Sequence, residues 1–357
     1  MRILHLVKNF NFGGAENHVR DLANVMDEMG NDVFIVSNRG MQNNLLNKGV
    51  RFFSLKMNDL FILFHILFVV YIIRKNKIEV LHAHQRLPIL IACIAGRIAR
   101  VPVIVTVHGS SQRDLRSAIS IRIPDMFIFV RQYIIDDDIE YRVPLHKTIV
   151  IPNGVSILNP LPDCDFNSLC YISRIDKRHS SLISMIIRKV IVPVSEDYPE
   201  VILNIVGDGD YLDDLRQEAE IINRQLKREA IIIHGYMTDV KGIIQKSGLV
   251  LGVGRVAIET LSCGVSLLSV NHKFLGTVIS QDNYPFYKRS NFVSVDSPPP
   301  TEGGLIRSLQ DYFKNHLNWK KEALLLQKRI DEDFNMLRVV TAITNLYKKE
   351  IELKKGG

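Results

Sequence analysis

The chain has 357 residues, of which 46% are hydrophobic and 23% charged, a composition that excludes a disordered protein and is typical of a globular one. Its length is more than one ordinary core needs and predicts two domains. The formal net charge of +7 favours anionic partners such as phosphates or a membrane surface, with a merely solvated basic surface as an equal alternative. There is no nucleic-acid-binding motif, so we expect no nucleic-acid partner.

The cysteines, which are Cys93, Cys164, Cys170 and Cys263, show neither metal-ligand spacing nor a disulfide framework, and this fits a reducing cytoplasm. The apolar run at Met1 is too short for a signal peptide and is typical of a first strand.

The first half of the chain alternates strand and helix patterns, which predicts a parallel sheet covered by helices on both faces. The expected strands are Arg2–Val7, Asp32–Ser37, Ile78–His82, Val103–Val107, Asp125–Val130 and Thr148–Ile151. The expected helices are Ala15–Met29 and Leu87–Ala99.

One almost wholly apolar stretch, Leu60–Ile73, precedes the basic residues Arg74, Lys75 and Lys77. It is shorter than the roughly 20 apolar residues that span a bilayer. Two interpretations stay open. One is a buried helix, and the other is a helix that dips into a membrane surface with its basic residues on phospholipid head groups.

The second half repeats the architecture, so the fold class is α/β with two Rossmann-like, doubly wound parallel-sheet domains. We expect domains at residues 1–157 and 158–334 and a C-terminal helix, 335–357, that packs back on the first domain. The join near Asn159–Asp165 holds Pro160 and Pro162, and Ser297–Gly304 is expected to be a loop. Ligands of such sheets bind at the carboxyl ends of the strands, so a cleft between two such edges is the expected site.

Two motifs of the first half follow expected strands. Gly13-Gly14-Ala15-Glu16 is expected at the start of a helix. Glycines let the backbone approach a phosphate closely, and a helix N-terminus favours an anion. The alternative interpretation of this motif is a simple turn. His82-Ala83-His84 and Thr106-Val107-His108-Gly109 place histidines at strand ends. Since no carboxylate or thiol accompanies them at ligand spacing, we do not expect a metal site.

The motifs of the second half also follow strands. A basic cluster contains Arg174 and Lys177, and a guanidinium group in particular suits phosphate oxygens. Further along lie the turn with Gly207 and Gly209, the loop with Met237, and a segment Leu251–Gly264 that contains Gly254, Arg255 and Glu259. A carboxylate such as that of Glu259 can accept hydrogen bonds from two hydroxyl groups.

These motifs, together with the chain reversal Ile151-Pro152-Asn153-Gly154-Val155, occur in an order that resembles the retaining GT-B glycosyltransferases of family 4. The resemblance covers nearly the full length, and it is nearest to a branch with a G-x-G-R turn in place of the first glutamate of the paired-glutamate motif.

The resemblance implies transfer of a sugar from a UDP or GDP donor to an acceptor hydroxyl of a lipid-linked or cell-envelope glycan, without a cofactor or metal. It implies His108, Arg174 and Glu259 as catalytic residues. The donor-binding residues it implies are Gly13, Gly14, Lys177, Gly207, Gly209, Met237, Gly254 and Arg255.

Two positions depart from the family pattern: His179 replaces its lysine, and Leu251 replaces its first glutamate. A non-catalytic nucleotide-sugar-binding or partner protein and a nucleotide-sugar epimerase therefore remain as alternatives. A nicotinamide dehydrogenase is disfavoured because neither glycine-rich turn has the dinucleotide spacing. We expect the protein in the cytoplasm, with peripheral contact to the inner face of the cytoplasmic membrane.

Overall fold

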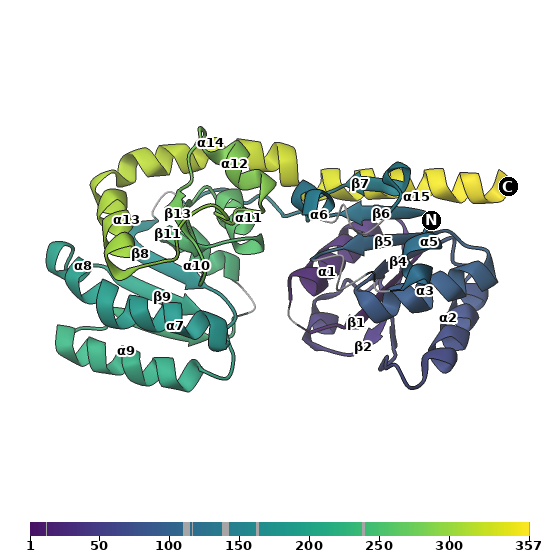
Figure 1. Ribbon diagram of the computed structural model, residues 1–357, viewed down its shortest axis with the longest axis horizontal. Coiled ribbons are helices and arrows are strands. Elements are labelled where there is room, and N and C mark those ends of the chain that lie inside the picture. Colours follow the sequence, from purple (N-terminus) through teal and green to yellow (C-terminus); the bar gives the residue numbers. More distant parts are fainter. Residues whose placement is uncertain are drawn as a thin grey trace. The chain divides into compact units, whose positions relative to one another are not determined.

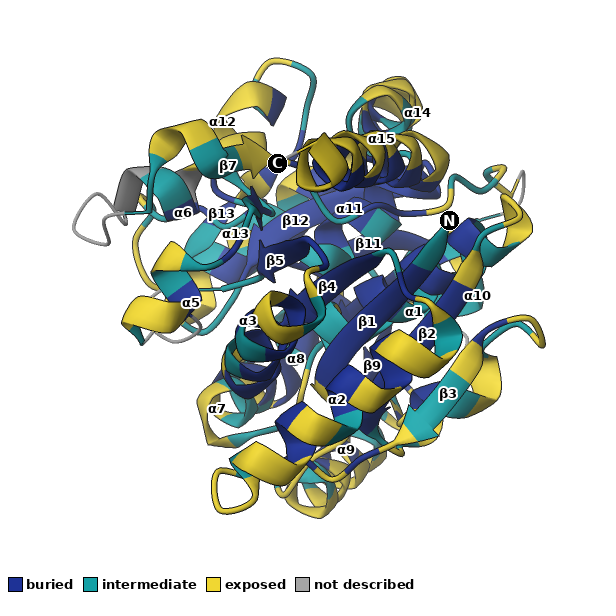
Figure 2. Cartoon of the chain, turned by 90° about the vertical axis from the view of Figure 1, so that its right-hand side faces the viewer, coloured by how far each residue is buried: buried dark blue, intermediate teal, exposed yellow. Residues whose placement is uncertain are grey.

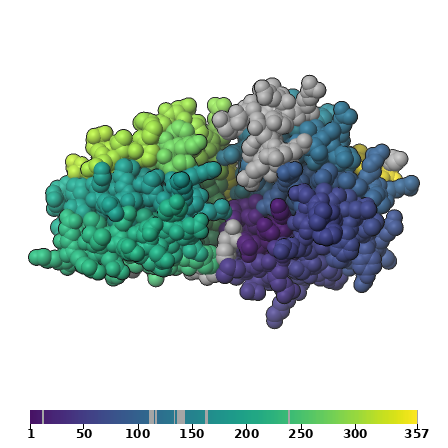
Figure 3. Space-filling model, turned by 60° about the horizontal axis from the view of Figure 1, so that its bottom comes forward, coloured from purple at the N-terminus to yellow at the C-terminus, as the bar shows by residue number. Residues whose placement is uncertain are grey.

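The computed structural model describes residues 1–11, 13–109, 115, 117–137, 143–161, 164–237 and 240–356. It divides the chain into two compact units. Unit 1 comprises Met1–Gly154 together with Phe334–Gly357, and unit 2 comprises Val155–Asp333. In Figure 1 unit 1 runs from purple to blue and ends in the yellow C-terminal helix, whereas unit 2 runs from teal to light green. Figure 3 shows the atoms of both units in the same colours.

Unit 1 is built on a parallel sheet with the strand order β3-β2-β1-β4-β5-β6-β7. Its strands are β1 (Arg2–Asn9), β2 (Asp32–Asn38), β3 (Arg51–Ser54), β4 (Val80–His84), β5 (Val103–Val107), β6 (Met126–Phe129) and β7 (Thr148–Val150). The central strands β1, β4 and β5 are dark blue in Figure 2 because both of their faces are covered.

Helices cover both faces of this sheet. The larger are α1 (Gly14–Glu28), α2 (Ile62–Asn76), α3 (Arg86–Ala99) and α15 (Met336–Gly356), and the shorter are η1 (Met41–Leu45), α5 (Ala118–Arg122), α6 (Gln132–Asp137) and η3 (Leu145–Lys147). The hydrophobic cluster on one face holds side chains of α2 and α3, and the cluster on the other holds side chains of α1 and α15. The C-terminal helix α15 is therefore part of the unit 1 core.

Unit 2 has a sheet with the strand order β10-β9-β8-β11-β12-β13. Its strands are β8 (Asp165–Ile172), β9 (Ile202–Val206), β10 (Ile231–Gly235), β11 (Ser247–Gly252), β12 (Ser266–Val270) and β13 (Leu275–Val278). Its helices are α7 (Lys177–Met185), continued by a π-helical turn η4 (Ile186–Val190) and α8 (Ile191–Asp197), then α9 (Leu212–Leu226), α10 (Val240–Lys246), α11 (Arg255–Ser262), α12 (Tyr284–Arg289), α13 (Glu302–Lys314) and α14 (His316–Phe334).

The expected fold class is confirmed, and the structure differs from the expected elements in three respects. The edge strand β3, the helix α12 and the strand β13, which pairs antiparallel with β12, follow no pattern that we had read from the sequence. Strand β4 ends at His84, so His82 lies inside the strand and not at its end. Residues 302–304, which were expected in a loop, already belong to α13, because the Thr301 side chain accepts from the Gly304 N–H and caps the helix earlier. Pro162 lies outside the described residues.

Candidate functional site: the carboxyl edges of the two sheets

The sequence-predicted residues of unit 2 follow the carboxyl ends of neighbouring parallel strands. Met237 follows β10, the turn of Gly207 and Gly209 follows β9, and Arg174 follows β8. Gly254 follows β11. Since these strands are adjacent in the order β10-β9-β8-β11, the residues come together at one edge of the sheet.

Backbone contacts hold the loop after β8 against the loop after β9. The Ser173 N–H donates to the Val206 carbonyl at 3.1 Å, and the Ile175 N–H donates to the Asp208 carbonyl at 3.0 Å. A Cβ at Gly207 would lie 1.9 Å from the Ser173 carbonyl oxygen, and one at Gly209 would lie 2.3 Å from that of Ile175. Glycine is therefore required at both positions for the two loops to approach this closely.

The basic cluster begins α7. Asp176 caps the helix, because its side chain accepts from the backbone N–H groups of Arg178 and His179, and it also contacts His179 Nδ1 at 2.8 Å. Partial burial alone would raise the pKa of Asp176, but these hydrogen bonds and the neighbouring His179 hold it below its usual value. Arg174 and Lys177 are exposed on either side of this cap. Two cations thus stand in solvent at a helix N-terminus, an arrangement that favours an anion.

The segment after β11 contains a close ion pair. Gly254 has a positive φ of 64°, and its N–H donates to the Asn291 carbonyl at 3.0 Å. One turn into α11, Arg255 Nε lies 2.7 Å from Glu259 Oε1, and both side chains are 14% exposed. Leu251, in the register of the family's first glutamate, is buried in the hydrophobic core of unit 2. A glutamate at position 251 would be a buried charge without a partner. In this turn the charged group that pairs with Glu259 is the guanidinium of Arg255.

Two residues of this edge escaped the sequence analysis. His272 and Lys273 follow β12, and the rings of His272 and His179 lie 5.2 Å apart, edge to face. Burial lowers the pKa of His272, and the nearby positive groups of His179, Lys273 and Arg178 lower it further. Their position directly after an expected strand was the signal that could have found them.

The predicted residues of unit 1 also share one edge, in the strand order β1-β4-β5. Gly14 begins α1, and a Cβ added there would meet no atom of the described part of the chain within 4 Å. Gln85, directly after β4, has a positive φ of 67°; its side chain accepts from the Lys8 N–H at 3.1 Å and donates to Glu16 Oε1 at 2.6 Å. A non-glycine residue in this conformation is strained, and such strain concentrates at functional sites. Gln85 was also missed, since nothing in its sequence context marks it.

A layer of histidines lies beneath this edge. Residues of a strand alternate between its faces, so His82 and His84 of β4 point the same way. The strand register pairs His5 of β1 with His82, and His84 with Thr106 of β5. His5, His82, His84 and Thr106 are all fully buried. The edge histidine His108 follows β5 and extends the layer.

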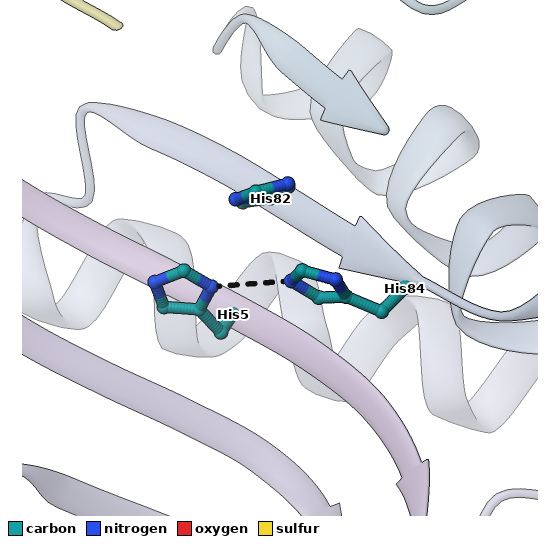
Figure 4. A group of neighbouring side chains, drawn as sticks. All are labelled: His5, His82 and His84. Atoms are coloured by element: carbon teal, nitrogen blue, oxygen red, sulfur yellow. Dashed lines mark hydrogen bonds between the residues drawn. The ribbon is translucent and has the colours of Figure 1, made fainter. Parts of the chain in front are cut away.

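The ring nitrogens of this layer form two separate sets of hydrogen bonds. His82 contacts Thr106 Oγ1 at 2.6 Å and the Tyr347 hydroxyl of α15. His84 Nδ1 lies 3.0 Å from His108 Nε2. On its other side, His84 Nε2 lies 3.4 Å from His5 Nδ1, the contact dashed in Figure 4. Burial lowers the pKa of His5 to about 3 and those of His82 and His84 well below their usual range, so all three rings are neutral.

His5, His82 and His84 are close enough together to be considered as metal ligands, since one nitrogen of each lies within 4.8 Å of the others. However, both nitrogens of His82 already contact hydroxyl groups, and both nitrogens of His84 contact other histidines. Figure 4 shows that the three rings do not converge on a common point. The geometry therefore favours a hydrogen-bonded layer over a metal centre.

Helix α2 carries both of the features expected of the Leu60–Ile73 stretch. One face is buried on α3 and the sheet, through residues such as Ile66, Val69 and Ile73. The other face exposes a row of large apolar side chains, which together with Leu60 and Phe61 just before the helix are Leu63, Phe64, Leu67 and Tyr71. Arg74, Lys75 and Lys77 are exposed at its C-terminal end. None of the helices in the described ranges is long and apolar enough to cross a membrane.

Three comparisons with known proteins bear on this geometry. Residues 12–157 match the model of Glycosyltransferase Family 4. The UDP-Gal:alpha-D-GlcNAc-diphosphoundecaprenol alpha-1,3-galactosyltransferase of Escherichia coli is 23% identical over 309 residues, which are 77% of this chain and 76% of that protein. Anabaena Alr3699/HepE in complex with UDP superposes with a TM-score of 0.74 at 18% identity, over 98% of this chain and 100% of that one. A glycosyltransferase from Rickettsia africae gives the same TM-score at 16% identity, over 98% of both chains.

Two Rossmann-like units, each built on a largely parallel sheet, are the architecture of the GT-B class, and the structural likenesses have this fold. With the family match and the curated relative, this chain is a GT-B glycosyltransferase. Its N-terminal unit matches the model of Glycosyltransferase Family 4 over residues 12–157.

Proposed function

We propose that the chain transfers a sugar from a UDP-sugar, with retention at the anomeric carbon, to a hydroxyl of a lipid-linked glycan. The observation that carries this proposal is the single edge of unit 2 at which exposed cations, glycine-dependent loops and the Arg255–Glu259 pair come together. The relative from Escherichia coli is named for a UDP-Gal donor and a diphosphoundecaprenol-linked acceptor, and Anabaena Alr3699/HepE binds UDP and UDP-glucose.

In unit 2 the departing diphosphate would be stabilised by Arg174 and Lys177, since an exposed guanidinium and ammonium meet phosphate oxygens without a metal. The N–H groups of the turn with Gly207 and Gly209 and of the turn with Gly254 would approach the nucleotide by their backbones. Met237 would border the base.

Glu259 would hold the ribose hydroxyls, and Arg255 supports this role. A bare carboxylate beside a diphosphate would repel it. The Arg255 guanidinium, 2.7 Å away, offsets the charge of Glu259 and leaves its other oxygen to accept from a hydroxyl. The G-x-G-R turn is thus consistent with a working donor site that differs from the paired-glutamate form.

In unit 1 the helix start at Gly13 and Gly14 and the edge histidine His108 would contact the donor phosphate and the transferred sugar. This part of the proposal is supported by their common position at the carboxyl edge and by the space at Gly14, where a Cβ would meet no atom of the described residues within 4 Å.

The acceptor side of the proposal includes the membrane. A lipid-linked acceptor stays at the bilayer surface, so its enzyme benefits from docking there. The exposed apolar row of α2 would enter the head-group region, and Arg74, Lys75 and Lys77 would each contribute roughly 1 kcal/mol on anionic lipid. We place the protein at the inner face of the cytoplasmic membrane on this argument.

Release of UDP from a panel of UDP-sugars, measured with and without a lipid-diphosphate-sugar acceptor, tests the function. Release only with the acceptor, an α-linked product, and loss of both in Arg174→Ala and Glu259→Ala are expected. Arg289→Ala, an exposed arginine of the same unit, serves as the matched control. UDP release without an acceptor would favour a nucleotide-sugar epimerase or hydrolase, and failure to bind any nucleotide would favour a non-catalytic partner role.

A further inference from the structure

The turn that follows α12 has an unusual backbone. Asn291 and Phe292 are consecutive, and both have a positive φ, of 56° and 60°. Asparagine is tolerated in this left-handed region, but a bulky side chain such as that of phenylalanine is rarely found there. Strain of this kind persists only where the surrounding contacts hold it, and it concentrates at functional sites.

Contacts of Phe292 hold the turn in this conformation. Its side chain is fully buried, and its ring centroid lies 5.8 Å from that of Tyr284. Its N–H donates to the Tyr287 carbonyl at 2.7 Å, and its carbonyl accepts from the Ser269 hydroxyl at 2.8 Å. Since Ser269 lies in the last turn of the pleat of β12, Phe292 anchors this turn at the carboxyl edge of the sheet.

The anchored turn places Asn291 against the glycine turn after β11. The Asn291 carbonyl accepts from the Gly254 N–H at 3.0 Å. Asn291 Nδ2 lies 3.2 Å from the place that a Cβ of Gly254 would take, so the amide stands beside the Gly254 backbone. Gly254 directly precedes α11, which carries the Arg255–Glu259 pair of the proposed donor site. Asn291 therefore belongs to the same edge, although it lies far along the chain from these residues.

The side-chain amide of Asn291 is partly exposed, and neither its oxygen nor its nitrogen has a hydrogen-bond partner among the described residues. The side chains of Asn204, Asn223 and Asn283, which the same unit also buries in whole or in part, are all hydrogen-bonded. A primary amide offers both N–H donors and an oxygen acceptor. A sugar hydroxyl also donates and accepts, so it matches this group better than a phosphate oxygen, which only accepts.

The order of the strands indicates which part of the donor the amide meets. In the proposed function Met237, after β10, borders the base, and Arg174, after β8, meets the diphosphate. The turn of Asn291 and Phe292 contacts the ends of β11 and β12, which lie on the other side of β8 from β10. A UDP-sugar that lies along this edge with its base at β10 therefore has its sugar on the side of Asn291.

We propose that Asn291 is a donor-binding residue whose amide hydrogen-bonds a hydroxyl of the transferred sugar, and that the strained turn holds it in place. This inference rests on the proposed function, which supplies the direction of the donor along the sheet edge. Its consequence is a contact that distinguishes a UDP-sugar from UDP, because UDP has no sugar hydroxyl at this end.

Glycine at position 291 separates the amide from the backbone. Glycine adopts a positive φ without strain and keeps the carbonyl that accepts from Gly254, so Asn291→Gly removes the amide alone. Asn291→Asp tolerates the same φ and keeps the shape of the side chain but removes its N–H donors. Asn318→Ala is the matched control, because Asn318 is exposed on α14, and His316 at the start of α14 stacks on Phe166 at the opposite end of β8.

Calorimetric titration of the full chain with UDP, UDP-glucose and UDP-galactose tests the proposal. For the UDP-sugar that the wild type binds more tightly, we expect affinity to fall about five- to tenfold in Asn291→Gly and at least as much in Asn291→Asp, as the loss of one hydrogen bond predicts. Asn291→Gly should bind UDP within about twofold of the wild type and unfold at the same temperature. Asn318→Ala should match the wild type in every titration.

An unchanged affinity of Asn291→Gly for both UDP-sugars would overturn the proposal and leave the proposed function intact. An equal loss for UDP and for the UDP-sugars would also overturn it, because the amide would then act on the nucleotide and not on the sugar. If Asn291→Gly did not fold, wild-type affinity of Asn291→Asp for both UDP-sugars would overturn the contact. A wild type that bound neither UDP nor a UDP-sugar would overturn the proposed function together with this inference.

Discussion

Helix α2 offers the most quantitative prediction. Leu63 is 69% exposed and Leu67 is 58% exposed, on the face of the helix that the core leaves uncovered. Full burial of a leucine is worth about 1.5–3 kcal/mol relative to full exposure, so insertion of these two side chains contributes roughly 2–3 kcal/mol to membrane binding. The double substitution Leu63→Ser with Leu67→Ser is therefore expected to lower the partition coefficient roughly 30- to 150-fold.

The assay is cosedimentation of the purified protein with vesicles of phosphatidylglycerol and phosphatidylcholine. Leu337→Ser on α15, which changes a leucine that is 57% exposed elsewhere on unit 1, is the matched control and should bind like the wild type. Binding should also weaken with salt, because Arg74, Lys75 and Lys77 act through screened charge. Thermal unfolding should be unchanged in all variants, since no core contact is lost. A wild type that ignores anionic vesicles, or a double variant that binds as well as the wild type, would refute the reasoning.

Three further predictions concern stability. In urea titrations, Gly207→Ala should lower the free energy of unfolding by about 1–3 kcal/mol, because its Cβ would meet the Ser173 carbonyl. The control Gly14→Ala should not destabilise the protein. Equal stability of the two variants would contradict the loop packing. In a double-mutant cycle, Arg255→Met and Glu259→Leu should each lower the free energy of unfolding by about 3 kcal/mol. The double variant should lose clearly less than the sum of the two, whereas additive losses would show that the ion pair is not coupled. Burial holds the pKa values of His5, His82 and His84 far below those of the unfolded chain. The unfolded state therefore binds more protons than the folded state once the pH falls below about 6.5. The free energy of unfolding should then drop by about 1.4 kcal/mol per pH unit for each ring. His82→Gln should make this pH dependence shallower by one such increment, and an unchanged slope would show that His82 is not buried and neutral.

The α/β class and most of the strands could be predicted because buried parallel strands are continuous apolar runs separated by helical periodicity. The elements that we missed lack this signal. Strand β3 has only four residues and lies at the edge of its sheet. Strand β13 follows β12 after a tight turn and pairs with it antiparallel, so the alternation of strand and helix that marks the other strands does not precede it. We expected a loop at residues 302–304 because Gly303 and Gly304 favour one. Helix α13 begins earlier because Thr301 caps it.

The candidate site was predictable to the level of strand ends and no further. Position after a strand placed Arg174, Gly207 and Gly254 at one edge without any structure. What the sequence could not show is pairing through space. Tyr347 of the last helix contacts His82, 265 positions earlier in the chain, and His84 contacts His5 of the neighbouring strand β1 and His108 directly after β5. These contacts follow from helix packing and strand register, which a list of motifs does not contain.

The central claim is that unit 2 of this GT-B glycosyltransferase binds the UDP-sugar donor at its carboxyl edge. Calorimetric titration with UDP and with GDP tests it most directly, in the wild type, Arg174→Ala, Glu259→Ala and the control Arg289→Ala. We predict that UDP binds the wild type and Arg289→Ala alike, more tightly than GDP, and that its affinity falls at least about tenfold in Arg174→Ala and in Glu259→Ala, as the loss of a charge-assisted contact implies. Binding of UDP that is indifferent to Arg174 and Glu259 would contradict the assignment of the site.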